Sequence, residues 1–169
     1  MNKNRLKELV RRLQDDPKNY DLWLDVGQLK KFFNNYQGAI AVFEHAARLY
    51  PEHPLAYYNL ANIYGLYLGN YAKAEAYYLK TIELEPNQDY VYLGLAEFYR
   101  DFYKAKFSQI DDVLLQGLQT LPGDPNMTLQ LAYYYKSIGD KENARDYFSK
   151  LLTSSHINDA QKDALRDEI

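Results

Sequence analysis

The sequence predicts an all-α fold built from paired helices that repeat along the chain. A pattern of large and small apolar residues returns at intervals of roughly 34 residues, which is typical of repeat architectures. Within the intervals apolar residues recur at helical spacing, as Ile40, Phe43 and Ala47 do. Pro54 and Pro125 stand where a proline can occupy the first position of a helix. These observations favour a stack of helix pairs.

The pattern occurs four times in tandem. Each copy has an anchor, aromatic in the first three copies, and a small residue in a first helix. The second helix then has an anchor, which is Ala except for Ile110, and a large side chain four residues later. The first-helix anchors are Trp23, Tyr57, Tyr92 and Thr128. The second-helix anchors are Ala39, Ala74, Ile110 and Ala144.

This pattern resembles the tetratricopeptide repeat, in which W-x2-L-G-x2-Y is followed by A-x3-F and then P. The resemblance extends from about Tyr20 to His156. It implies a right-handed α-solenoid of stacked antiparallel helix pairs, with about four repeats in a single array over residues 1–169. The expected repeats are 20–53, 54–88, 89–124 and 125–156.

Both ends of the chain are expected to cap the array, because a stack of repeats would otherwise expose its last apolar faces. Residues 1–17 match the second half of a repeat and predict an N-terminal helix. Residues 158–169 predict a C-terminal capping helix with a charged outer face.

The copies differ in length between their two anchors. Trp23 to Ala39 is 16 residues, whereas Tyr57 to Ala74 is 17 and Tyr92 to Ile110 is 18. Since loops tolerate insertions best, we expect the additional residues in loops near 69–70 and 104–107.

The chain has 18 tyrosines, and most of them fall at the fixed positions of the repeat. We interpret these as packing residues whose rings fill volume while the hydroxyl stays near water. The family resemblance implies that the first helix of each pair lines a concave groove. The residues expected to bind a partner there are Leu24, Gln28, Leu55, Tyr58, Asn59, Asn62, Tyr90, Leu93, Glu97, Arg100, Leu129 and Tyr133.

Such a groove suits an extended or helical peptide. The alternative is a solvated inner wall without a dedicated ligand. A subset of the family clamps the C-terminal carboxylates of chaperones with Lys, Asn and Arg. At the corresponding positions only Asn59 matches in one register and only Asn62 in the other, so that ligand is not indicated.

Composition weighs against several other classes. Lys and Arg number 20 against 23 Asp and Glu, so a basic footprint for nucleic acid is not expected. The chain lacks cysteine, and His45, His53 and His156 are isolated, so we expect no metal site and no catalytic residues. There is no glycine-rich phosphate loop, and we expect no cofactor. No apolar run of about 18 residues exists, so no membrane insertion is expected within this chain.

The sequence therefore predicts a non-catalytic scaffold that binds a peptide or protein segment. The alternative is an accessory domain of a larger enzyme or of a membrane-anchored assembly factor. The compartment stays open, since the chain is cytoplasmic as written or a soluble domain cut from a membrane-anchored protein.

Overall fold

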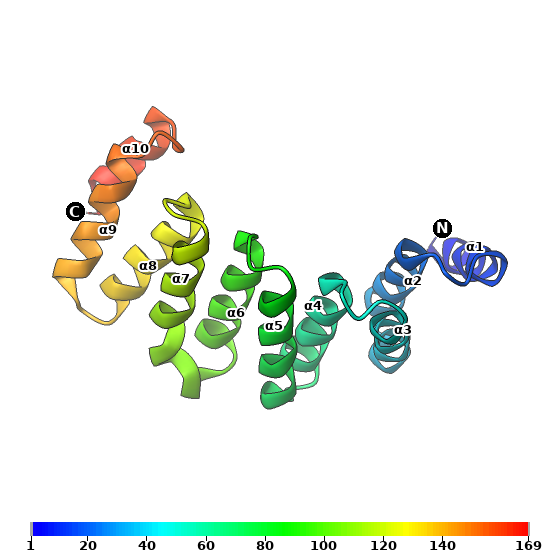
Figure 1. The fold of residues 1–169 in the computed structure, drawn as a ribbon. Helices are drawn as coiled ribbons and strands as arrows, with labels where there is room; N and C mark the ends of the chain where they lie inside the picture. The colour runs from blue at the N-terminus through cyan, green and yellow to red at the C-terminus, as the bar shows by residue number, and fades with distance from the viewer. Residues whose placement is uncertain (1, 169) are drawn as a thin grey trace. The chain divides into compact units, whose positions relative to one another are not determined.

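A computed structural model describes residues 2–168, and all regular secondary structure in that range is helical (Figure 1). The chain forms two compact units that divide between Glu85 and Pro86.

The N-terminal unit contains a single helix and two helix pairs, in which α2 packs on α3 and α4 on α5 (Figure 1). A π-helical turn, η1, continues α4. The elements are α1 (Asn2–Asp15), α2 (Tyr20–Phe32), α3 (Tyr36–Leu49), α4 (Pro54–Asn62), η1 (Ile63–Tyr67) and α5 (Tyr71–Leu84).

The C-terminal unit likewise contains two helix pairs, α6 with α7 and α8 with α9, followed by a last short helix. A 3-10 helix, η2, connects α6 to α7. The elements are α6 (Asp89–Asp101), η2 (Lys104–Gln109), α7 (Ile110–Thr120), α8 (Pro125–Ser137), α9 (Lys141–Thr153) and α10 (Asp159–Arg166).

Three of the turns inside the pairs share one design. A residue in the left-handed region, such as Gly69 at φ 65° or Gly139 at φ 81°, ends the first helix. The next residue, Asn70 or Asp140, caps the second helix by accepting a hydrogen bond from a backbone N–H three residues on. In the first pair Asn34 and Asn35 take these two roles.

The two helices of the first pair touch at a glycine. A Cβ added to Gly27 on α2 would lie 2.5 Å from the ring of Phe43 on α3, and that ring is fully buried. In the other copies Ala61, Ala96 and Ala132 stand at the corresponding position and are also buried. In the first pair a small residue on the first helix thus admits a large side chain from the second.

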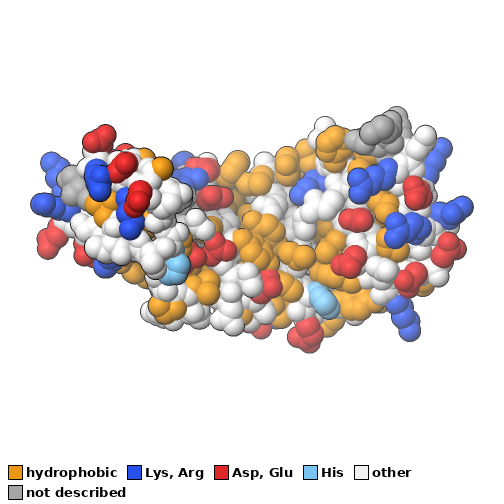
Figure 2. Space-filling model, turned by 90° about the horizontal axis from the view of Figure 1, so that it is seen from above, with side chains coloured by type: hydrophobic (Ala, Val, Ile, Leu, Met, Phe, Trp, Pro, Cys, Tyr) orange, Lys and Arg blue, Asp and Glu red, His pale blue; other side chains and the backbone are white. Residues whose placement is uncertain are grey.

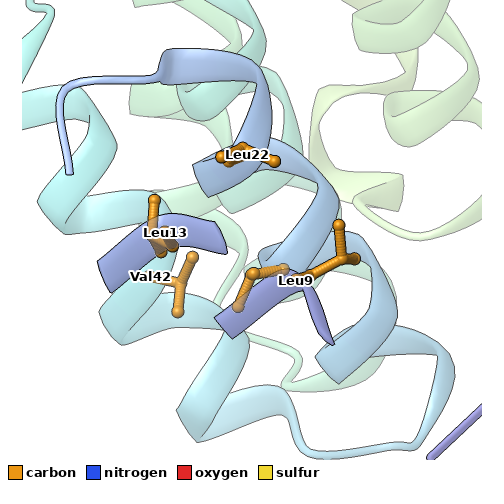
Figure 3. Close-up of a cluster of buried hydrophobic side chains, with 5 residues drawn as sticks. Leu9, Leu13, Leu22 and Val42 are labelled. Carbon is orange, nitrogen blue, oxygen red and sulfur yellow. The ribbon is translucent and has the colours of Figure 1, made fainter. Parts of the chain in front are cut away.

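Helix α1 is held to the first pair by a hydrophobic cluster (Figure 3). Leu9 and Leu13 of α1 meet Leu22 of α2 and Val42 of α3, and all four are buried. The apolar face of α1 therefore covers side chains of the first repeat that would otherwise contact water.

The anchors of the first and third copies occupy equivalent places. Trp23 donates its indole N–H to the carbonyl of Pro17 over 2.9 Å, and Tyr92 donates its hydroxyl to the carbonyl of Pro86 over 3.0 Å. Each anchor thus reaches the proline that lies six residues before it.

The insertions take regular forms. In the second copy the turn at 69–70 is present, but the expectation that it holds the additional residue is wrong. That residue is absorbed inside the first helix as the π turn η1, where Leu68 N–H donates to Ile63 O over 3.2 Å. A single residue added to a helix is accommodated in this way without breaking it. In the third copy the additional residues lie in the expected segment, but they fold as η2.

Replacing Gly27 with alanine tests the close contact between α2 and α3. On helix propensity alone, alanine in place of glycine would stabilise the folded protein by about 1 kcal/mol. Because its Cβ would overlap the buried Phe43 ring, we expect a net loss of about 1–3 kcal/mol in the free energy of unfolding. Urea denaturation measures it, and adding Phe43→Leu should recover part of the clash energy in a double-mutant cycle. A higher melting temperature for Gly27→Ala would contradict the contact.

Candidate protein-binding surface

Most tyrosines serve packing, in agreement with the sequence. Tyr78 and Tyr92 are almost fully buried, and the hydroxyl of Tyr78 donates to Asn62 Oδ1 over 2.8 Å, linking α5 to α4. Only Tyr67, Tyr71 and Tyr133 are classed as exposed. An exposed ring is therefore uncommon here.

Several of the expected groove residues in the N-terminal unit contact the second helix of their own pair. Leu24 packs against the cluster that contains Phe43. Tyr58 meets Tyr78 edge to face, with ring centroids 5.9 Å apart. Both Leu24 and Tyr58 are half-buried, whereas Leu55, at the start of α4, is 42% exposed.

Asn59 joins the two first helices of this unit. It is only 5% exposed. Its Oδ1 accepts hydrogen bonds from Gln28 Nε2 at 2.8 Å and Lys31 Nζ at 3.4 Å, and its Nδ2 donates to Leu55 O. Asn59 therefore positions Gln28 and Lys31, which lie nearer to solvent.

The C-terminal unit repeats the arrangement. Leu93 of α6 and Leu129 of α8 are half-buried at the positions of Leu24 and Tyr58. Tyr133 is 43% exposed and meets the buried ring of Phe148 edge to face at 5.3 Å. Tyr90 is half-buried and Glu97 is exposed.

Arg100 connects α6 to α8. Its Nη1 donates to Gln130 Oε1 over 2.9 Å, and its Nε and Nη2 donate to the two carboxylate oxygens of Asp101. This bidentate contact lowers the pKa of Asp101 and fixes the guanidinium plane.

A pocket of about 130 Å³ adjoins Arg100 and Tyr133. Phe107 of η2 and Tyr134 of α8 both line it, and their ring centroids lie 5.6 Å apart. Ala96 and Ile110 also contribute to the wall, which makes the lining largely apolar. The sequence predicts Arg100 and Tyr133 at this surface but does not predict the pocket. The one signal for the pocket in the sequence is Phe107, an aromatic residue inside the insertion of the third copy.

Charges of both signs are interspersed on the face drawn in Figure 2. Within residues 2–168 no helix is both long and apolar enough to cross a membrane. Over the same range no three acidic or histidine side chains gather closely enough to hold a metal ion.

Stacked helix pairs with a repeating surface define a helical-repeat interaction scaffold. Two family models, both described as tetratricopeptide repeat, match the chain, one over residues 55–88 and 127–155 and the other over residues 20–63. The chain belongs to the tetratricopeptide repeat family. Such repeats typically form non-catalytic scaffolds that bind other proteins.

One curated relative is human tetratricopeptide repeat protein 6, which is 30% identical over 70 residues. This match covers 41% of the chain and only 13% of that protein, so the chain spans a small part of the relative's length.

Solved structures share the fold over almost the whole chain. A MamA fragment from Desulfovibrio magneticus RS-1 has a TM-score of 0.69 at 16% identity, over 98% of this chain and 88% of that one. PilW, described as a type IV pilus biogenesis factor, has a TM-score of 0.69 at 20% identity, over 97% of this chain and 74% of that one. YrrB, described as a TPR protein with an unusual peptide-binding site, has a TM-score of 0.66 at 15% identity, over 99% of this chain and 84% of that one. These likenesses confirm the predicted class of stacked helix pairs.

Asn59→Ala tests whether the buried amide links α2 to α4. The substitution removes the acceptor that Gln28 and Lys31 share. We expect it to lower the free energy of unfolding by about 1–2 kcal/mol. The control is Asn126→Ala, which removes an exposed amide that donates to Asp89 and should change stability by no more than about 0.5 kcal/mol. Equal urea midpoints for the two variants would contradict the structural role of Asn59.

Proposed function

We propose that this scaffold binds an extended or helical segment of a partner protein on the surface of the first helices of its pairs. In the C-terminal unit that surface lies on α6 and α8. In the N-terminal unit it lies on α2 and α4.

The pocket beside Arg100 and Tyr133 is the observation that carries the proposal. Its volume of about 130 Å³ suits one apolar side chain of a bound segment, and its wall is largely apolar and aromatic. Gln130 lies next to it, and Arg100 holds that amide in place. Peptide sites combine an apolar pocket with a few fixed polar groups in this manner.

The predicted residues take different parts in this proposal. Exposed Leu55 and Tyr133 are direct contacts for a partner. In the N-terminal unit the half-buried Leu24 and Tyr58 form an apolar floor, and in the C-terminal unit the half-buried Tyr90, Leu93 and Leu129 form another. The polar groups beside these floors are Gln28, Asn62, Glu97 and Arg100, and Asn59 acts through Gln28.

The alternative is that the array is an accessory part of a larger enzyme or membrane-anchored assembly factor. Two observations favour it: the curated relative is much longer than this chain, and PilW is described as a biogenesis factor. An apolar segment or catalytic domain encoded in the same reading frame would establish this alternative. An accessory array would still use its surface to hold a partner.

Tyr133→Ala tests the binding surface. Peptides selected by display on the full chain would be titrated by fluorescence anisotropy against the parent and the variant. Since Tyr133 is exposed, its loss should weaken binding about tenfold or more and change the melting temperature little.

The matched control is Leu79→Ala, which truncates a side chain of similar exposure, 50% against 43%, on the second helix α5. The parent and the control should bind alike. If Leu79→Ala weakened binding and Tyr133→Ala did not, the partner would use the second helices and the proposal would be wrong.

A further inference from the structure

A larger pocket in the N-terminal unit has a different chemical character. It measures about 620 Å³ and is lined by residues of α1, α2, η1, the start of α3 and the turn before α3. Two cations, Arg5 and Lys31, and one carboxylate, Asp25, contribute to its wall. Phe32 and Tyr67 add aromatic surface.

Helix α1 and the π turn η1 complete a wall that α2 mainly supplies. Leu9 is buried in the cluster that fixes α1 to the first repeat (Figure 3). Arg5 lies four residues before Leu9, which places the two on the same face of α1, and both line the pocket. The π turn carries Tyr67, whose ring stacks on that of Tyr36 with centroids 4.6 Å apart and planes at 22°. Turns of this kind frequently occur at functional sites.

Lys31 is the cation that α2 contributes to the pocket. It is half-buried, and this burial lowers the pKa of its ammonium group. Its hydrogen-bond acceptor is the neutral Asn59 Oδ1 at 3.4 Å. In the part of the chain that the structure describes, no carboxylate forms an ion pair with Lys31 or Arg5. A partly desolvated cation gains from an incoming carboxylate, which would restore the interaction that water no longer supplies.

Apolar surface lies next to these cations. Phe32 is 66% exposed and Tyr67 is 50% exposed, and no other large apolar side chain among the described residues is as exposed as Phe32. A ligand that fits must therefore combine a negative group with an apolar one. Asp25 disfavours a second negative charge at the same place, which argues against a doubly charged phosphate.

We propose that this pocket binds one acidic side chain, Glu or Asp, within a partner's segment, while an adjacent apolar residue of that segment packs on Phe32 and Tyr67. Lys31 Nζ and the Arg5 guanidinium are the donors to the carboxylate. The inference rests on the proposed function, in which first helices hold a partner's segment, and it adds the chemistry that the N-terminal unit recognises.

Amide NMR on the full chain tests this with three short probe peptides. The first carries a Glu-Leu pair and is blocked at both ends, by acetyl and amide groups. The second replaces Glu with Gln. The third keeps Gln but has a free C-terminal carboxylate, so that it separates a side-chain carboxylate from a terminal one.

The Glu peptide should shift amide signals of α1, of Lys31 and Phe32, and of η1, and should bind at least about tenfold more tightly than the other two peptides. Lys31→Met should abolish this preference. Lys30→Met is the matched control, because Lys30 is an adjacent half-buried lysine that does not line the pocket, and it should leave the preference intact. Melting curves establish that both variants fold.

Four outcomes would each overturn the inference. They are equal affinity for the Glu and Gln peptides, tighter binding of the free-carboxylate peptide, an equal loss of preference in the two lysine variants, and an absence of shifts at the pocket. So would a dimer in sedimentation that Phe32→Ser dissociates, because the surface would then join two copies of the chain. Shifts confined to α6 and α8 would leave the proposed function standing without this site. Shifts confined to the pocket would support the site and contradict the proposed use of α6 and α8.

Discussion

The fold depends on a small residue at one fixed position of the first helix in each pair, and in the first pair this residue admits a large side chain from the second helix. Gly27 against Phe43 shows it most directly, since even a methyl group would overlap the ring. Buried alanines, among them Ala61 and Ala132, stand at the corresponding positions of other copies. Because the second helix supplies the large side chain, the first helix keeps much of its other surface for solvent or a partner.

The sequence predicts the positions that recur in every repeat, but it does not predict the structure of the insertions between them. The places of Trp23 and Tyr92 follow from the period, because each copy solves the same packing problem. The form of an insertion does not follow, since one additional residue can extend a loop or widen a helix into a π turn such as η1. That a residue is asparagine also does not show whether it is buried. Asn59 can be buried because Gln28 and Lys31 donate hydrogen bonds to its amide oxygen. Neither pocket follows from the sequence, because each has an aromatic wall residue whose place depends on the form of an insertion.

The insertions connect the fold to its function. Each one adds an aromatic residue to a pocket, Tyr67 in the N-terminal unit and Phe107 in the C-terminal unit. Two of the exposed tyrosines, Tyr67 and Tyr133, line these pockets. A regular repeat supplies the frame, and the departures from regularity contribute to the two binding sites that we propose, one with a mainly apolar wall and one with two cations in its wall.

Hydrogen exchange measured by mass spectrometry on the full chain, with and without a display-selected peptide, tests most directly whether the first helices and the insertions form the binding surface. We expect slower exchange on binding in α6, α8 and η2, or in α2, α4 and η1, while the second helices keep their rates. Slower exchange confined to the second helices α3, α5, α7 and α9 would contradict it.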